Sequence, residues 1–323
     1  FPLNYGSGGS GSQNIFYSRR IGRSPHYSPE LNDGEYADIP EQTNILAAAK
    51  LSGKTRKGTS IGILESVTAE EFATIDNNGE RSRVSVEPMT NYFVGRVVQD
   101  MNEGNSILGG IFTSTYRNIK EEHLSFLPVS STTGGLDFQQ YWGERGYNIK
   151  IVNYFSHITG TEEAITALQV SPAHLYQRPD AEYLDLDTTR TSLSGYGGNI
   201  QFSKSSGNLN ILAGVVWKSP GLDVNDLGYF RIGDEIMDLT WFGYNFYEPF
   251  SIFRRIHLYI DQYSSWDFGG YLALVGIESG AYTRFTNFWS FEINSNINTD
   301  IRYNTYLRGG PSIIVPGGRT IYL

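Results

Sequence analysis

The sequence predicts an all-β protein, a transmembrane up-and-down antiparallel β-barrel of the outer-membrane type. One reason is composition: of 323 residues, 14% are aromatic, 36 are glycine and only 18% are charged, which is typical of strands joined by turns. A second reason is that tight turns near residues 57, 104, 145, 206 and 268 alternate with long polar loops near 78, 126, 175 and 224. Short turns at one end and long loops at the other are the layout of such a barrel.

The third reason is the alternation of apolar and polar side chains, because successive residues of a strand point to opposite faces of a sheet. Residues 44–69 predict a hairpin that turns at 54–58. On its outgoing strand Ile61, Ile63 and Val67 share one face, and Gly62, Ser66 and Thr68 share the other. The clearest alternation lies at 285–298. Its apolar face consists of Phe285, Trp289, Phe291, Ile293 and Ile297, opposite a polar face that includes Asn294, Asn296 and Asn298.

Residues 1–43 are predicted to be an N-terminal loop and linker with one short strand. Gly and Ser dominate 4–12, which favours a flexible linker. A short strand is expected at 14–21, and three prolines make 24–43 a loop. Residues 44–323 form the predicted barrel region.

Residues 73–83 and 120–133 are polar and are expected as loops. Residues 160–190 are the longest stretch without a strand pattern, with a short helix at 162–169. The strands expected after the first hairpin are 84–102, 106–119, 136–142, 147–159, 199–204, 208–218, 229–247, 255–263, 271–280, 285–298 and 301–307.

Charge and composition exclude several classes of protein. A net charge of −9 argues against a nucleic-acid partner, which needs a basic surface. The absence of cysteine excludes disulfides, thiolate zinc sites and cysteine nucleophiles. The sequence contains no run of ~18 apolar residues, so no transmembrane helix is predicted. A barrel strand, in contrast, needs only ~9–11 residues of alternating character. A soluble β-sandwich is the alternative fold. The polar face formed by Asn294, Asn296 and Asn298 suits the water-filled interior of a barrel better than the packed core of a sandwich.

Several strings of the chain are similar to one family. They are IFYSRRIGR (15–23), AAKLSGKT (48–55), SIGIL (60–64), VTAEE (67–71), VEPMTNY (86–92), GGLDF (134–138), QRPD (177–180) and SPGLDVNDLG (219–228). In this order they resemble the Gram-negative outer-membrane family called domain of unknown function 5916, over about residues 1–316.

The resemblance implies an outer-membrane location and no established activity. In the family a family-9-type carbohydrate-binding domain usually precedes the barrel region, and members continue beyond the segment at 309–311. The chain also opens on Phe1-Pro2-Leu3-Asn4 without a secretory signal. We therefore expect a mature or partial chain that supplies an incomplete portion of a larger barrel.

Two polar loops hold the candidate ligand-binding residues, which are Gln177, Arg178, Asp180, Asp223, Asn225 and Asp226. The 223–228 stretch resembles the start of a calcium loop, since hard oxygens cluster before a Gly, but the bidentate Glu is missing. No cofactor is predicted, and calcium is the one alternative. Asp180 with Asp223 or Asp226 would be the carboxylate pair of a glycosidase. The alternative for both loops is plain solvated structure with Asx turns.

The functional expectation is a pore, a transport component or a subunit of a cell-envelope assembly, without evident catalysis. Its expected partners are outer-membrane lipid and other outer-membrane or periplasmic proteins, with carbohydrate as a further candidate. One alternative is a membrane-associated hydrolase that acts on glycans through extracellular loops. The other is a soluble carbohydrate-binding β-protein.

Overall fold

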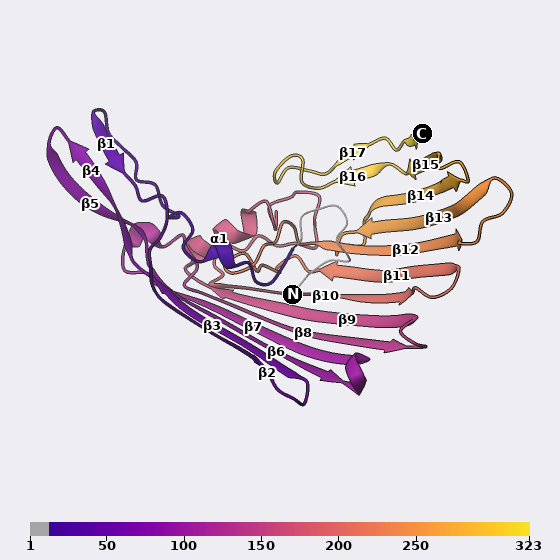
Figure 1. Cartoon of the computed structure of the whole chain (residues 1–323). Coiled ribbons are helices and arrows are strands. Elements are labelled where there is room, and N and C mark those ends of the chain that lie inside the picture. Colours follow the sequence, from indigo (N-terminus) through magenta and orange to yellow (C-terminus); the bar gives the residue numbers. More distant parts are fainter. Residues whose placement is uncertain (1–12) are drawn as a thin grey trace.

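The computed structural model describes residues 13–323 and has one dominant element, a 13-stranded antiparallel sheet. Figure 1 shows this main sheet as a curved trough, with the helix α1 and several connecting segments on its concave side. The all-β class is confirmed. The linker predicted at 4–12 lies outside the described residues.

Neighbours in the chain are neighbours in the main sheet, apart from two insertions. In spatial order its strands are β18 (Arg319–Tyr322), β15 (Ser290–Asn298), β14 (Leu272–Phe285), β13 (Phe253–Trp266), β12 (Glu235–Phe246), β11 (Leu209–Lys218), β10 (Ser192–Lys204), β9 (Tyr147–Thr159), β8 (Ser130–Trp142), β7 (Ser106–Asn118), β6 (Met89–Met101), β3 (Thr59–Thr68) and β2 (Ile45–Lys54). The predicted up-and-down order is therefore present.

The two insertions form small sheets of their own. β4 (Glu71–Asn77) and β5 (Glu80–Glu87) pair with β1 (Glu35–Asp38) in a three-stranded sheet that projects from one end of the trough (Figure 1). β16 (Ile301–Tyr303) and β17 (Ile313–Val315) form a two-stranded flap between β15 and β18 in the chain. The prediction of a loop at 73–83 is therefore wrong, because the turn at Asn78-Gly79, with φ of 52° and 96°, closes a hairpin there.

The remaining regular elements are short. They are the helix α1 (Glu162–Val170) and the 3₁₀ turns η1 (Ser18–Arg20), η2 (Asn102–Gly104) and η3 (Glu122–Leu124). Thr161 caps α1 by accepting a hydrogen bond from the Ala164 amide, and two glutamates in the first turn favour its positive end. The short helix predicted at 162–169 is thus confirmed, whereas the strand at 14–21 is replaced by η1. No described helix is long and apolar enough to span a membrane.

Short turns join the strands at one end of the trough, and long segments join them at the other. The turns at 55–58, 102–105, 143–146 and 205–208 lie at the short-turn end as predicted. The turn near 268 was assigned to the same end, and this is wrong: the β12–β13 turn at 247–252 takes that place, and 267–271 lies at the long-segment end. The expected strand 285–298 is also interrupted, by a turn at 286–289.

The two faces of the main sheet differ in what covers them. The inner face lies against three stretches of the chain, 13–34, 160–191 and 219–234, which we call the inner segments. The outer face is uncovered and carries apolar side chains such as Leu136, which is 66% exposed. On β3, Ile61 and Ile63 lie on the outer face, while Ser66 and Thr68 are buried on the inner one. Other outer-face residues are Leu108, Phe112, Phe155, Ile200, Ile260, Ile277, Phe291 and Ile297.

The hydrophobic core lies between the inner face and the inner segments. Its largest cluster joins Val152 and Tyr154 of β9 to Ile15, Leu222 and other residues of the inner segments. A second cluster packs α1, through Ile165, against strands β9 and β10. The inner segments are therefore fixed parts of the fold.

Within residues 13–323 the main sheet does not close. Its edges are β2 and β18, and neither pairs with a further strand. All ten residues of β2 are exposed. A closed barrel is thus not present in the described part of the chain.

Candidate functional site

The six candidate residues predicted from the sequence lie on two inner segments. Gln177, Arg178 and Asp180 follow α1, whereas Asp223, Asn225 and Asp226 belong to the segment between β11 and β12. Most of their polar groups are engaged with other residues of the chain. The contacts divide into one set that fastens the inner segments to the sheet and one set that borders a cavity.

Asp226 belongs to the fastening set. Its carboxylate forms an ion pair with Arg117 of β7, whose side chain is fully buried and also donates to the Pro128 carbonyl. Burial alone would raise the pKa of the Asp226 carboxyl, but Arg117 and Arg23 outweigh burial and hold that pKa below its usual range. Asp226 is therefore ionised at neutral pH.

Asp223 and Asn225, in the same segment, bond to residues of the other inner segments and of β9 as well as to their own segment. Asp223 Oδ2 lies 3.0 Å from His174 Nε2, and the Asp223 amide donates to the Ser156 hydroxyl of β9. Asn225 Oδ1 accepts from the Phe230 amide and from Arg20. These bonds order the segment at 219–234 and attach it to its neighbours.

Arg178 belongs to the set that borders a cavity. Its guanidinium donates to Asp234 Oδ2 at 2.9 Å and to the Tyr183 hydroxyl, and Arg178 and Asp234 are only 4% and 5% exposed. Burial raises the pKa of Asp234, although Tyr183, the Phe268 amide and Arg178 oppose this. The two residues form a structural ion pair at the edge of the cavity, and Asp234 contributes to the cavity lining.

Asp180 fastens the flap of β16 and β17. It accepts from Arg302 of β16 at 2.7 Å and from the Ser312 amide at 3.0 Å, and Arg302 also reaches Asp267 at 3.3 Å. Burial alone would raise the pKa of Asp180, but the hydrogen bonds from Ser312 and Arg302 lower it to about 2. Gln177 lies beside the same region, where it packs against Gly309 and donates to the Val170 carbonyl.

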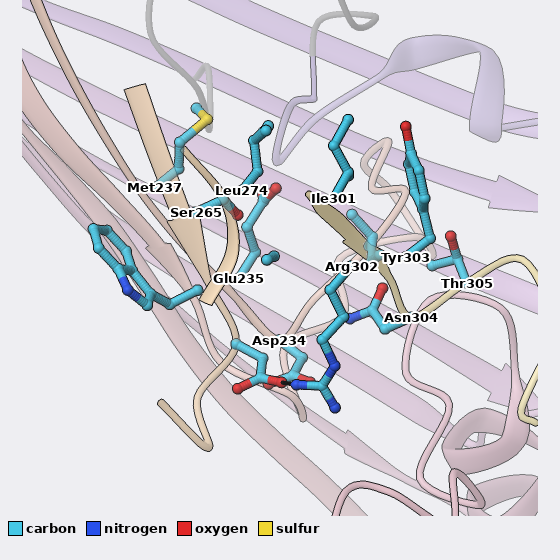
Figure 2. A pocket seen from close by; sticks show the side chains of 14 residues that line it. Asp234, Glu235, Met237, Ser265, Leu274, Ile301, Arg302, Tyr303, Asn304 and Thr305 are labelled. Carbon is cyan, nitrogen blue, oxygen red and sulfur yellow. Dashed lines mark hydrogen bonds and ion pairs between the residues drawn. The ribbon is translucent and has the colours of Figure 1, made fainter. Parts of the chain in front are cut away.

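A cavity of about 270 Å³ lies between the flap and strands β12 to β14. Figure 2 shows Met237, Ser265 and Leu274 on the side of the main sheet, with Ile301 and Tyr303 of the flap opposite them. A second hollow of about 420 Å³ shares Ile232, Glu235, Met237 and Thr305 with the first. The lining of this cavity combines apolar and polar side chains.

Of the two carboxylate pairs predicted for a glycosidase, Asp180 with Asp226 lacks the protonated carboxyl group that the reaction requires. Such an enzyme needs one carboxyl group that is protonated near neutral pH. Asp180 and Asp226 both have lowered pKa values and each faces an arginine. As for calcium, the described residues contain no group of three or more His, Asp or Glu side chains arranged to share a metal ion.

Sequence reasoning missed the residues that shape the cavity, above all Asp234, Asp267 and Arg302. Arg302 is 122 positions from its partner Asp180, and no motif connects them. Asp267 and Trp266 were read as part of a tight turn at the short-turn end, which hid their place beside the flap. The one sequence feature that pointed to these residues is the acidic loop at 177–187. Any of its carboxylates that become buried need a cationic partner from elsewhere in the chain.

Comparisons with known proteins give one match. A family model with the description Domain of unknown function (DUF5916) matches residues 11–309. No curated protein and no solved structure matches the chain significantly.

Proposed function

The chain belongs to the family described as Domain of unknown function (DUF5916), and we propose that it forms part of a β-barrel wall in a Gram-negative outer membrane. Its role there is non-catalytic, as a transport component or as a subunit of a cell-envelope assembly. The lumen beside β6 to β11 is filled by the inner segments. The proposal is therefore a plugged wall and not an open diffusion pore.

The observation that carries the proposal is the uncovered apolar outer face. Twelve of the thirteen strands contain 9 to 14 residues, and a tilted membrane strand needs about 9–11. Soluble monomers rarely expose contiguous apolar patches of more than a few hundred Å². Lipid chains are the partner that suits this face.

The distribution of aromatic and acidic residues along the outer face also supports contact of this face with lipid. Exposed aromatic rings gather at the short-turn end, where barrels place an interfacial girdle; they are Trp142, Tyr247, Phe250, Phe288 and Trp289. Tyr116 and Tyr196 are exposed near the other end. Two acidic side chains of the outer face, Glu65 and Asp238, lie near the long-segment ends of β3 and β12. Headgroups can solvate them there.

The open edges imply partners in the membrane. β2 presents ten residues whose outer edge is unpaired, and hydrocarbon does not tolerate exposed backbone N–H and C=O groups. Another strand, from this protein or from an envelope partner, must cover that edge. We therefore propose that β2 and β18 are the sites at which the wall is completed.

Neighbouring residues of one strand provide the test, because the chain has no natural cysteine. Ile297→Cys and Asn296→Cys would carry a fluorophore on the outer and the inner face of β15. In lipid vesicles containing the full chain, lipid-borne quenchers should act on the label at 297, and iodide should act on the label at 296. Equal quenching of both labels by iodide, or recovery of the chain as a monomer without detergent, would refute a membrane wall.

A further inference from the structure

We propose that the cavity between the flap and strands β12 to β14 binds a neutral saccharide of about one ring. This goes beyond the proposed wall function and does not depend on it, because the cavity is defined by contacts within the chain. Its volume of about 270 Å³ is just below the ~300–1,000 Å³ typical of small-molecule sites, and the volume of the adjoining hollow, about 420 Å³, is within that range.

The charges of the cavity lining are already compensated. Its charged residues are Asp234, Glu235, Asp267 and Arg302. Arg302 pairs with Asp267 as well as Asp180, and Asp234 pairs with Arg178. Glu235 pairs with Lys218 at 2.6 Å. A charged ligand within the cavity beside the flap would therefore have to break an existing pair or remain uncompensated, which disfavours it. The adjoining hollow adds Lys218, which is paired with Glu235, and Arg231.

Uncharged polar groups of the lining are free, in contrast. In residues 13–323, the side chains of Ser265, Asn304 and Thr305 line the cavity and have no hydrogen-bond partner. Ser265 belongs to the main sheet, and the other two directly follow β16 of the flap. Together they offer donors and acceptors from both sides, which suits a ligand with several hydroxyl groups.

The rest of the lining is apolar and aromatic. Met237, Leu274 and Ile301 form an apolar surface, and Trp266 and Tyr303 add rings. A sugar ring has apolar C–H faces and polar hydroxyls at its rim, so it matches a lining with one apolar surface and neutral polar groups around it. A purely apolar ligand would leave the hydroxyl and amide groups unpaired, at a cost in affinity.

The experiment measures binding of defined sugars to the full chain by calorimetry and Trp fluorescence. The detergent must lack a sugar headgroup, because such a headgroup would compete. Glucose, galactose and N-acetylglucosamine are the neutral probes, and glucuronate and glucosamine are their charged counterparts. We expect at least one neutral sugar to bind at ~10 mM or below, and the charged counterparts to bind at least about tenfold more weakly.

Two variants locate the site on both sides of the cavity. Ser265→Ala on the sheet and Thr305→Val on the flap should each weaken binding by up to about tenfold, the effect of one lost hydrogen bond. Neither side chain has a bond within the described protein to lose, so folding should be preserved. Ser279→Ala on the outer face of β14 is the matched control and should bind as the parent does.

The proposal fails if no neutral sugar binds, if charged sugars bind equally well, or if all three variants retain parental affinity. These outcomes leave the wall function untouched, since that is judged by the quenching of labels at 296 and 297. A chain that binds sugar but behaves as a soluble monomer would refute the wall and keep the site.

Discussion

The ion pair between Arg117 and Asp226 should hold the inner segment at 219–234 against the main sheet. Asp226→Asn keeps the shape of the side chain and removes its charge. The Arg117 side chain is 0% exposed, and its Nε has no hydrogen-bond partner among the described residues. The variant therefore leaves a buried guanidinium uncompensated, with Arg23 as a second nearby cation.

Removal of one partner of a buried pair typically costs about 3–5 kcal/mol. Because each 1.4 kcal/mol is a factor of ten, the equilibrium for release of the segment should shift by roughly 10² to 10⁴. Urea unfolding followed by Trp fluorescence in detergent measures the total loss. Limited proteolysis within 219–234 tests whether the segment is released first.

Two controls make this prediction decisive. Lys120→Gln removes an exposed pair with Glu70, in which Lys120 is 56% exposed, and should cost at most about 1 kcal/mol. The double variant Arg117→Met with Asp226→Leu replaces the pair by apolar groups and should recover most of the loss. If Asp226→Asn shifts the unfolding midpoint no more than Lys120→Gln does, the pair does not anchor the segment.

Two further predictions concern contacts of the inner segments. Gly195→Ala should destabilise the fold by about 1–3 kcal/mol, because a Cβ there would lie 2.0 Å from the Leu222 nitrogen. The control Gly62→Ala, at a position with open space around it, should be neutral or stabilising by up to about 1 kcal/mol. Equal urea midpoints for the two variants would contradict this reasoning. The pKa of Asp180 is lowered to about 2, so its contribution to holding the flap is complete above its unfolded pKa of about 3.9 and is lost as pH falls toward 2. Hydrogen exchange of residues 301–315 should show that loss in the parent and not in Asp180→Asn; an identical pH profile in both would assign it to other groups.

The strands of the main sheet were predictable from the sequence because period-two alternation is a local property. On β3 and β8 the apolar side chains, such as Ile63 and Leu136, do lie on one face and the polar ones, such as Ser66 and Asp137, on the other. The alternation did not reveal which connections lie at which end. Both the connection at 266–270 and the one after Phe246 contain aromatic and turn-forming residues, so composition does not distinguish them. The pairing of β12, β13 and β14 shows that they lie at opposite ends of the main sheet.

The inner segments were harder to predict, since polar residues are as typical of solvated loops as of buried ion-pair networks. Asp180 and Asp226 were correctly placed in loops, but their partners Arg302 and Arg117 lie on distant elements. The approach of Gly195 to the turn at 219–222 leaves no trace in the sequence beyond a glycine within a strand. Such contacts are tertiary, and propensity does not encode them.

The position of the inner segments in the chain has a consequence for the order of folding. The segments at 160–191 and 219–234 directly flank the β10–β11 hairpin that they cover, so their contacts close short loops and form at low entropic cost. Residues 13–34 reach the same place from far away, as in the bond from Arg20 to the Gly228 carbonyl across 208 positions. The hairpin and its two flanking segments should thus assemble as one early unit, and the N-terminal segment should dock onto it last.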